Sequence, residues 1–195
     1  MWQRIKIIYI IWYRDLLRYW RNKVRVVSGL AFPILWLVFF GTGISSSLKI
    51  IGGENIDYVE FLFPGILAMN LIFSSIFSAI STVTDREYGF LREILVAPIS
   101  RGSIALGKTL GGATTAFIQT MLIVILAPII GITLNLKMVL ILMPAMFLVS
   151  FALTSLGVLI ASKLKTSEGA SLVFQFIAVS YTHLRAHETS LHLVC

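Results

Sequence analysis

Few residues of this 195-residue chain are of the types that carry out chemistry. The only cysteine is Cys195 and the only histidines are His183, His187 and His192, so all four lie in the last thirteen residues. Upstream of them the sequence excludes a disulfide, a thiolate nucleophile, an imidazole base and a His or Cys metal site. We therefore predict no catalytic residues, no metal site and no cofactor, and a protein that is not itself an enzyme.

Two short motifs imitate known sites without the structural context that those sites need. His187 and Glu188 followed by His192 look like a zinc-protease helix, but that motif spaces its histidines by four residues and here the spacing is five. Residues 102–109, GSIALGKT, match a phosphate-binding loop letter for letter. Such a loop follows a buried strand in a soluble α/β domain, whereas this one stands at the start of a long apolar run. We expect neither zinc nor nucleotide binding.

The composition of the chain changes abruptly at Ser180. The stretch 179–189, VSYTHLRAHET, resembles the translation of a transposase-type sequencing-library adapter over eleven residues. We therefore expect residues 180–195 to be a non-native tail and the chain to be truncated at its C-terminus, with a different native sequence after about Ala178. Non-native residues of this kind carry no information about the native fold.

The chain as a whole is far more apolar than a soluble protein. Its residues are 57% apolar and 13% charged, with a mean hydropathy of +0.91. A soluble domain carries about 25% charged residues, and a chain with half that share cannot cover itself with polar surface. The net charge of +7 does not indicate nucleic-acid binding, because the basic residues lie between long apolar runs. The composition excludes a soluble enzyme and predicts an integral membrane protein with no nucleic-acid partner.

Four uncharged runs are long enough to cross a membrane. They contain 23, 24, 28 and 25 residues between flanking charges, and a transmembrane helix needs roughly 20. A fifth apolar run begins at Gly169 and reaches only about half a span before the tail. We predict an all-α, polytopic membrane bundle in residues 26–179, with four complete spans and the start of a fifth at 26–46, 61–84, 109–132, 138–162 and 169–179.

Basic residues are shared unequally between the two sides of these spans. Residues 1–25, 85–108 and 163–168 hold thirteen Lys and Arg, whereas the other connections hold only Lys49 and Lys137. Connections rich in Lys and Arg remain in the cytoplasm. We therefore predict a multi-pass protein with a cytoplasmic N-terminus and a cytoplasmic loop at 85–108.

Residues 1–25 are too charged to span the membrane and carry no signal-peptide cleavage site. A helix here has an apolar face and an opposite charged face, formed by Ile5, Tyr9, Trp12, Leu16 and Trp20 and by Arg4, Arg14, Asp15, Arg18 and Arg21, respectively. Ile7 and Ile11 fall on the charged side, against this pattern. Because Trp and Tyr favour the headgroup zone and Arg attracts anionic lipid, we predict an interfacial helix on the inner leaflet. The alternative is a basic flank that only fixes orientation.

The four predicted spans contain no Asp, Glu, Lys, Arg or His. Transporters driven by ions or protons usually keep such residues at membrane depth, so any energy for transport must enter from outside the membrane. The polar residues that remain there are Ser, Thr and Gln, and helix packing explains them better than a substrate pathway does.

The loop at 84–108 is the most informative stretch. Its first part continues the helical spacing of the second span, and Pro98 is expected to stop that helix. Ser100 can then cap a short second helix that ends near Leu106, before Gly107 and Lys108 lead into the third span. We expect a helix, a turn and a short surface helix that together dock a soluble partner.

At this point the sequence resembles the type-2 family of ATP-binding-cassette transporter permeases, the drug and lipo-oligosaccharide exporter type. The resemblance rests on the N-terminal helix, on FLFPGILAMN at 61–70 and on DREYGFLREILVAPISRGSIALGKTLGGATTAFIQ at 85–119. Members of the family have six spans, and this chain ends inside the fifth.

In that family the cytoplasmic loop forms a coupling helix that fits a groove of the ATPase subunit. The resemblance assigns this role to Ala97, Pro98, Ile99, Ser100 and Arg101, with Glu87, Gly89, Arg92 and Glu93 in the approach helix. It implies an exporter permease in the plasma membrane of a prokaryote, whose partners are an ATPase subunit, a second permease copy or paralogue, and membrane lipid. A membrane scaffold that docks a cytoplasmic partner without transport is the main alternative. A membrane-embedded enzyme that uses Asp85 or Glu87 is weaker, because catalytic side chains are nearly absent.

Overall fold

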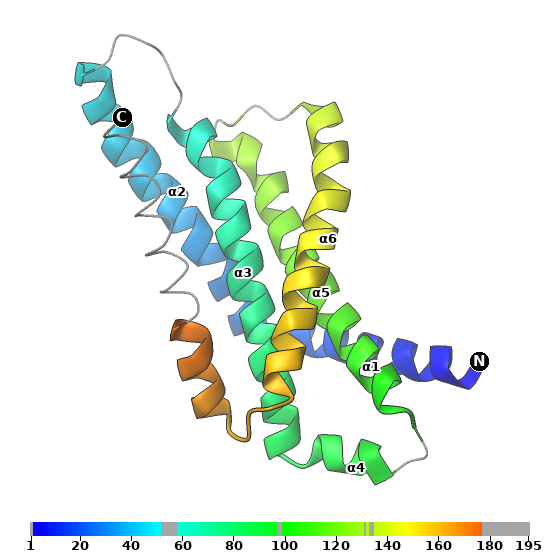
Figure 1. Ribbon diagram of the computed structural model, residues 1–195. Helices are drawn as coiled ribbons and strands as arrows, with labels where there is room; N and C mark the ends of the chain where they lie inside the picture. The colour runs from blue at the N-terminus through cyan, green and yellow to red at the C-terminus, as the bar shows by residue number, and fades with distance from the viewer. Residues whose placement is uncertain (1, 52–57, 97–98, 131, 133–134, 177–195) are drawn as a thin grey trace, which may run out of the picture.

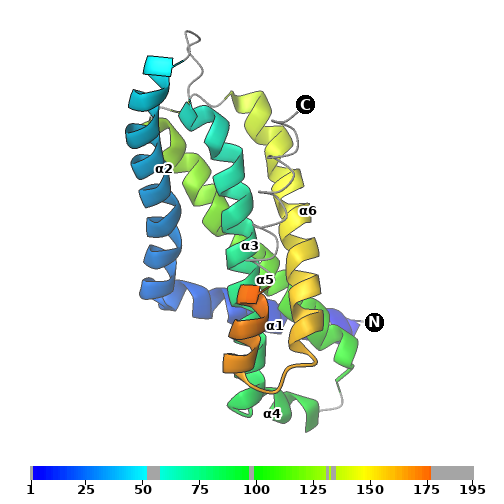
Figure 2. The same cartoon turned by 60° about the vertical axis from the view of Figure 1, so that its left-hand side comes forward.

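The computed structural model describes residues 2–51, 58–96, 99–130, 132 and 135–176 (Figure 1). Within these ranges the regular backbone is helical and contains no strand, which confirms the predicted all-α class. Long helices stand side by side, and two further helices, α1 and α4, lie at one end of this bundle (Figures 1 and 2). We call this the α1 end.

Helix α1 (Trp2–Arg21) is separated from α2 (Lys23–Ile51) by the single residue Asn22. The two helix axes bend by 73° at this elbow, so α1 crosses the bundle while α2 runs along it. The Oδ1 atom of Asn22 accepts a hydrogen bond from the backbone N–H of Arg25 at 3.1 Å, which satisfies one of the free donors at the start of α2. The predicted N-terminal helix is therefore present and distinct from the first apolar run.

Part of the charged face of α1, at Arg14 and Asp15, packs against the protein, and this explains the two isoleucines that contradict the amphipathic pattern. Ile11 and Tyr19 are the buried residues of this helix, at 5% and 2% exposure, whereas Ile5 and Tyr9 on the predicted apolar face are more than half exposed. Ile7, which shares the charged side, is half-buried. The two predicted faces therefore do not coincide with an exposed and a buried side, since Trp12 of the apolar face also contacts α5 and Arg4 and Arg21 of the charged face are exposed.

Helices α3 (Tyr58–Glu87), α5 (Arg101–Leu126) and α6 (Leu136–Ala161) form the rest of the bundle, with α5 at its centre. Segments of these helices are long and apolar enough to cross a membrane: Leu62–Glu87, Arg101–Leu126 and Lys137–Ala161. The bent pair of α1 and α2 supplies a fourth if it is counted as one span. The number of complete spans thus stays a prediction, while the helices that would form them are present.

The structure corrects the predicted shape of the 84–108 loop. The helix that continues the second span ends at Glu87, and the chain turns at Gly89, whose φ of 82° is a left-handed conformation that glycine adopts without a steric penalty. A separate helix, α4 (Phe90–Val96), follows. The break at Gly89 thus comes nine residues before Pro98, where it was predicted. Pro98 itself lies outside the described residues.

The second half of that loop is part of a long helix rather than a short surface helix. Ser100 caps it as predicted, since its Oγ accepts a hydrogen bond from the backbone N–H of Ser103 at 3.3 Å. No break follows at Gly107, and α5 continues to Leu126. Its first two turns therefore extend toward α4 as a rigid continuation of the third predicted span.

The remaining segments complete the connections. Helix α5 ends at Leu126, six residues before the predicted end of the third span at 132. A short 3-10 helix, η1 (Ala127–Ile130), follows it. Asn135 caps α6 through its Oδ1, which accepts from the backbone N–H of Lys137. A further helical segment at 167–176 agrees with the start of the predicted partial span, and residues 177–195, including the predicted tail, lie outside the described residues.

Neutral hydrogen bonds and glycine contacts hold the middle of the bundle. Asn70 on α3 donates to Thr120 on α5 at 2.8 Å, and Ser74 donates to Oε1 of Gln119 at 2.8 Å. Gly112 lies where α3, α5 and α6 meet, because a methyl group there would be 2.0 Å from the Oγ of Ser78. These polar side chains join helices, as the packing interpretation predicted.

Candidate functional site

The sequence Asp85-Arg86-Glu87 ends α3, and each of its three side chains binds a different neighbour. The carboxylate of Asp85 binds the ammonium of Lys108 on α5 and the guanidinium groups of Arg14 and Arg18 on α1. Asp15 completes the group, since it lies 3.0 Å from the Nζ of Lys108 and 3.0 Å from Arg14. We call Arg14, Asp15, Arg18, Asp85 and Lys108 the charge cluster.

Burial is uneven within the charge cluster. The side chains of Lys108 and Asp85 are 3% and 6% exposed, whereas Arg18 is 46% exposed. A buried ion that loses its partner is strongly destabilising, while an exposed pair contributes little. The Lys108–Asp85 pair is therefore the energetic centre of the cluster, and Arg18 lies at its rim.

Glycines on α5 allow α1 to approach this centre. A methyl group at Gly107 would lie 2.9 Å from Cβ of Ile11, and one at Gly111 would lie 3.0 Å from Cβ of Asp15. Nearby, the indole N–H of Trp12 donates to the hydroxyl of Thr114 at 3.0 Å. Small residues spaced by four positions let two helix backbones come close, and here that contact brings Asp15 to Lys108.

Arg86 and Glu87 extend the connections of α3 to the last part of the described chain. The Nη1 atom of Arg86 donates to the carbonyl oxygen of Ser162 at 2.9 Å, at the end of α6. The carboxylate of Glu87 accepts from the hydroxyl of Ser167 at 2.6 Å and from its backbone N–H at 3.3 Å, at the start of the 167–176 helical segment. The end of α3 thus contacts α1, α5, the end of α6 and the helical segment that follows it.

Helix α4 contacts the charge cluster through an aromatic ring. The guanidinium carbon of Arg14 lies 3.6 Å from the ring centroid of Phe90, the first residue of α4. A cation held over an aromatic face is attracted by its π electrons. Because Arg14 also binds Asp85, the chain returns after the Gly89 turn to the same cluster that it left.

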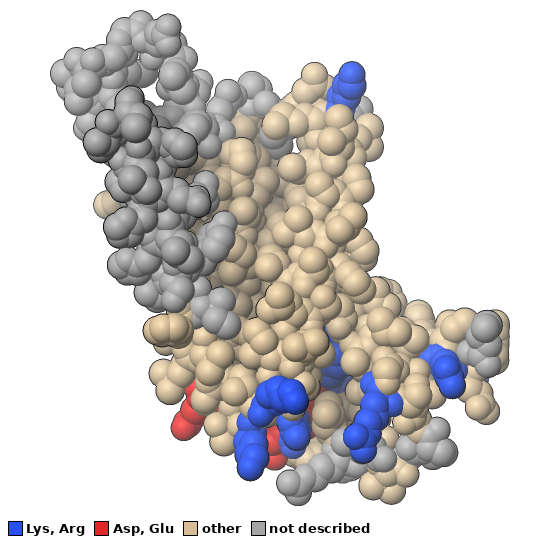
Figure 3. All heavy atoms as spheres, viewed as in Figure 1, with Lys and Arg blue, Asp and Glu red and all other residues tan. Residues whose placement is uncertain are grey.

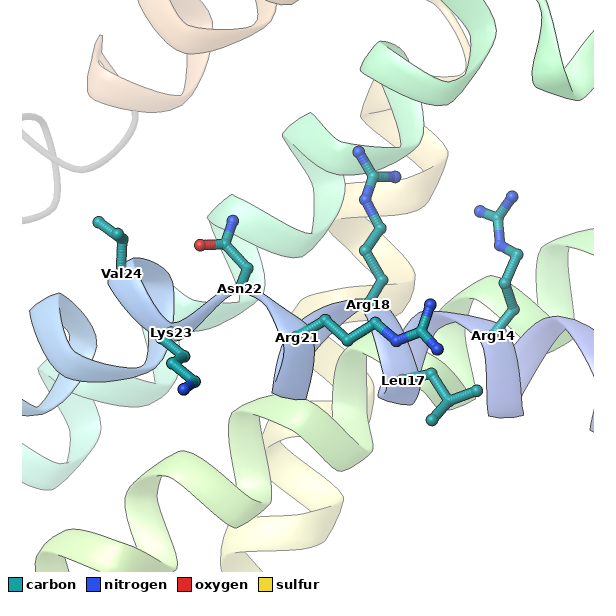
Figure 4. A pocket seen from close by; sticks show the side chains of 7 residues that line it. All are labelled: Arg14, Leu17, Arg18, Arg21, Asn22, Lys23 and Val24. Atoms are coloured by element: carbon teal, nitrogen blue, oxygen red, sulfur yellow. The ribbon is translucent and has the colours of Figure 1, made fainter.

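The α1 end also gathers the charged groups of the protein surface. In Figure 3 the basic and acidic side chains of the visible face lie mostly at this end, below an uncharged region that covers the bundle. Lys137, the second residue of α6, marks the opposite end. A hollow of about 700 Å³ at the elbow of α1 and α2 has Arg14, Arg18, Arg21 and Lys23 in its wall, and Figure 4 shows Arg14 and Arg18 projecting to the same side of α1.

The structure places part of the predicted coupling site. Glu87 ends α3, Gly89 forms the turn, Ser100 caps α5, and Arg101 is the exposed first residue of α5. Ile99 is half-buried. The backbones of Arg92 and Glu93 lie in α4, their side chains are not described, and Ala97 and Pro98 lie outside the described residues.

Sequence reasoning missed the charge cluster. It assigned Arg14, Asp15 and Arg18 to a face directed at lipid, and it treated Lys108 only as the entry to a span. Two signals point to the cluster in retrospect. One is Asp15, an aspartate that shares the charged face of α1 with arginines and with the apolar Ile11. The other is Lys108, the only charged residue in the sequence Gly107–Gly111. Neither signal names its partner, because the partners lie 71 and 93 residues away.

The phosphate-loop pattern at 102–109 has a different role in the fold. These residues form helical turns of α5 rather than a loop, and the ammonium of Lys108 is bound by Asp15 and Asp85. A phosphate-binding loop needs free backbone N–H groups and a free lysine. The structure therefore excludes a nucleotide site here, as the missing strand had indicated.

Comparison with known proteins identifies related sequences. The family model for ABC-2 type transporters matches residues 7–184. A protein of Cyanophora paradoxa named "Putative transport permease ycf38" is 32% identical over 148 residues, which cover 75% of this chain and 51% of that protein. Its namesake in Porphyra purpurea is 33% identical over 60% of this chain and 41% of that protein. The chain thus spans about half the length of these relatives, and no solved structure matches it significantly.

Proposed function

The chain belongs to the ABC-2 type transporter family, and from this premise we propose that it is the membrane permease subunit of an ATP-binding-cassette exporter. In this proposal a separate cytoplasmic ATPase hydrolyses ATP, and a second permease copy or paralogue completes the pathway. The apolar helices α3, α5 and α6 fit a membrane-spanning role. The exporter type, for drugs or lipo-oligosaccharides, and the plasma membrane of a prokaryote follow from the family resemblance and belong to the same proposal.

We further propose that the ATPase docks on the loop between α3 and α5, which is the coupling site of this permease. Its residues are Glu87, Gly89, Arg92, Glu93, Ala97, Pro98, Ile99, Ser100 and Arg101. The observation that supports this most strongly is the Asp85 carboxylate, which binds cations of α1 and α5 just before the loop begins. A force applied to the loop would therefore reach three helices at once.

The contacts of the α1 end favour transmission by a rigid body. Phe90 joins α4 to Arg14 of α1, and Gly107 lets α1 lie tightly on α5. Arg86 and Glu87 add the ends of α6 and of the following helical segment. Closure of two ATPases would tilt these elements together and switch the access of the pathway from one side to the other. Uncharged spans are consistent with this mechanism, since they need to bind no coupling ion.

The topology and the tail complete the proposal. We propose a cytoplasmic α1 end, an α1 that lies along the inner leaflet, and four complete spans followed by a fifth. Residues 180–195 are proposed to derive from a sequencing adapter. Resequencing the gene across codon 179 from unamplified template tests the last point, because a native reading frame would continue with an apolar span. A reading frame that encodes SYTHLRAHETSLHLVC refutes it and favours the scaffold alternative.

Crosslinking tests the coupling site. In a Cys195→Ser background, we would introduce Arg101→Cys and co-express the chain with the ATPase subunit of the proposed transporter. A thiol crosslinker should join the two proteins, with a yield that changes when ATP is added. The matched control is Lys137→Cys, at the opposite end of the bundle, which should not crosslink. Labelling of position 101 from outside intact cells would refute the topology, and a crosslink that does not respond to ATP would favour a scaffold.

A further inference from the structure

A cavity lies between α2, α3 and α5, away from the proposed coupling site. Its volume is about 530 Å³, within the range of pockets that hold small molecules. Aromatic side chains form much of its wall: Phe32 and Trp36 from α2, and Phe73 and Phe77 from α3. We call it the aromatic groove.

The floor of the aromatic groove is polar and neutral. Gln119 of α5 reaches it because α2 has Gly29 at the contact, where a methyl group would lie 1.9 Å from Nε2 of Gln119. The hydroxyl of Ser74 donates to Oε1 of Gln119, which fixes the amide. The groove is thus a built space between three helices, and it has no charged residue at this depth.

One end of the groove carries a cation without a carboxylate partner. Arg25 lines the groove, and within the described part of the chain its guanidinium makes no ion pair. Asp15, whose charge acts on Arg25 from a distance, forms its ion pairs with Arg14 and Lys108 instead. The Arg25 guanidinium carbon lies 6.0 Å from the ring centroid of Tyr19, and an anionic ligand in the groove would reach Arg25 because Arg25 lines it.

The length of the groove matches one leaflet of a bilayer. Arg25 is the last charged residue before the first uncharged run, so it lies at headgroup level. Trp36 follows eleven residues later on α2, which corresponds to about 16 Å along a helix. Half of a hydrocarbon core of about 30 Å has the same depth. The distance from the charge of Arg25 to the far end of the aromatic wall is thus similar to the distance from the headgroup of a lipid to the end of its acyl chain.

We propose that the aromatic groove binds an anionic phospholipid of the leaflet on the α1 side. Its phosphate lies at Arg25, and one acyl chain lies against Phe32, Trp36, Phe73 and Phe77. An anionic head supplies the countercharge that the described protein does not, and an acyl chain fills an apolar slot that opens at headgroup level. A zwitterionic lipid has the same tail but no net charge to offer Arg25, so it binds less tightly. This site is independent of ATPase docking.

Fluorescence quenching tests the site in the complete 195-residue chain. Trp2→Phe, Trp12→Phe and Trp20→Phe leave Trp36 as the only tryptophan. The chain is reconstituted in phosphatidylcholine vesicles that contain a small fraction of lipid brominated on its acyl chains, either phosphatidylglycerol or phosphatidylcholine. We expect half-maximal quenching at about a fivefold lower fraction of the anionic lipid, since one basic residue near a membrane contributes about 1 kcal/mol toward an anionic lipid.

Variants at the elbow locate the charge that is responsible. Arg25→Gln should abolish the preference for brominated phosphatidylglycerol, and Arg25→Lys should restore part of it. The matched control is Lys23→Gln, an exposed basic residue two positions earlier that lines the elbow hollow and not the groove, and it should keep the preference. Equal quenching by the two lipids in the parent chain, or a preference that survives Arg25→Gln, would overturn the proposal. Either failure leaves the proposed transport function untouched.

Discussion

The α1 end and the middle of the bundle use the same helices but different interactions. At the α1 end, five charged side chains from α1, α3 and α5 form one network around Asp85. In the middle, α3 and α5 are joined by neutral hydrogen bonds such as that between Asn70 and Thr120, and Gly112 lets α3, α5 and α6 approach closely. Within the described part of the three candidate spans, charged side chains occur only near the helix ends.

The difference follows from the cost of removing charge from water. A charged side chain at the centre of a bilayer costs at least about 2.5 kcal/mol, so helices there rely on small residues and uncharged donors. Near the aqueous boundary the penalty falls, and an ion pair can be strong and still reach solvent at its rim. If an ATPase docks between α3 and α5 as proposed, these ionic connections lie where its force would enter.

The strongest test of the comparison removes the centre of the charge cluster. Asp85→Asn should lower the free energy of unfolding by about 3–5 kcal/mol, because Lys108 is buried and keeps only Asp15 as a partner. SDS-titration unfolding in micelles measures this. Glu87→Gln, two residues further on and exposed, is the control and should cost less than about 1 kcal/mol. Equal effects of the two substitutions would contradict a buried centre.

A second test concerns close packing in the middle of the bundle. Gly112→Ala should destabilise by about 1–3 kcal/mol, since its methyl group would lie 2.0 Å from Ser78 Oγ and 2.6 Å from Thr154 Cγ2. Gly65→Ala in α3 is the control, because nothing lies within 4 Å of its added methyl group and the gain in helix propensity is the same. The same unfolding assay applies, and a stabilised Gly112→Ala chain would show that α5 is not tightly enclosed.

A third test measures a single neutral hydrogen bond at membrane depth. A double-mutant cycle of Ser74→Ala and Gln119→Leu should give a coupling energy of about 0.6 kcal/mol and no more than about 1.7 kcal/mol. The comparison cycle pairs Ser74→Ala with Thr115→Val, whose hydroxyl bonds within its own helix to Gly112, and should give a coupling near zero. A coupling energy as large as the loss of unfolding free energy in Asp85→Asn would contradict the difference between the two regions.

An effect of similar small size is expected at the contact of α4 with the charge cluster. A double-mutant cycle of Arg14→Gln and Phe90→Leu should give a coupling of about 0.5–1 kcal/mol, which is typical of a cation over an aromatic ring at a partly exposed site. Phe90→Tyr keeps the ring and should retain stability. If Phe90→Leu alone has no effect on unfolding but abolishes the ATP-dependent crosslink at position 101, the contact transmits motion without stabilising the fold.

Much of the fold could be predicted from residue types along the chain. The uncharged runs predicted the apolar helices, because a segment in hydrocarbon must satisfy its backbone hydrogen-bonding groups within a helix. Ser100 was recognised as a cap from its type and position, and α5 begins there. The break near the coupling loop was placed at Pro98, although Gly89 turns the chain earlier. A proline stops a helix without help, whereas a glycine ends one only where tertiary contacts favour the turn.

The sequence by itself determined an all-helical membrane protein of the ABC-2 type and the apolar segments that lie within its long helices, because hydrophobicity, capping and motif order are local properties. Only the tertiary structure decided that Arg14 and Asp15 of α1 face the protein, that Asp85 lies between Lys108 and the two arginines, and that Arg25 lies beside an aromatic groove. Each of these depends on which distant helix lies opposite, and the cost of burying an unpaired charge makes that choice specific.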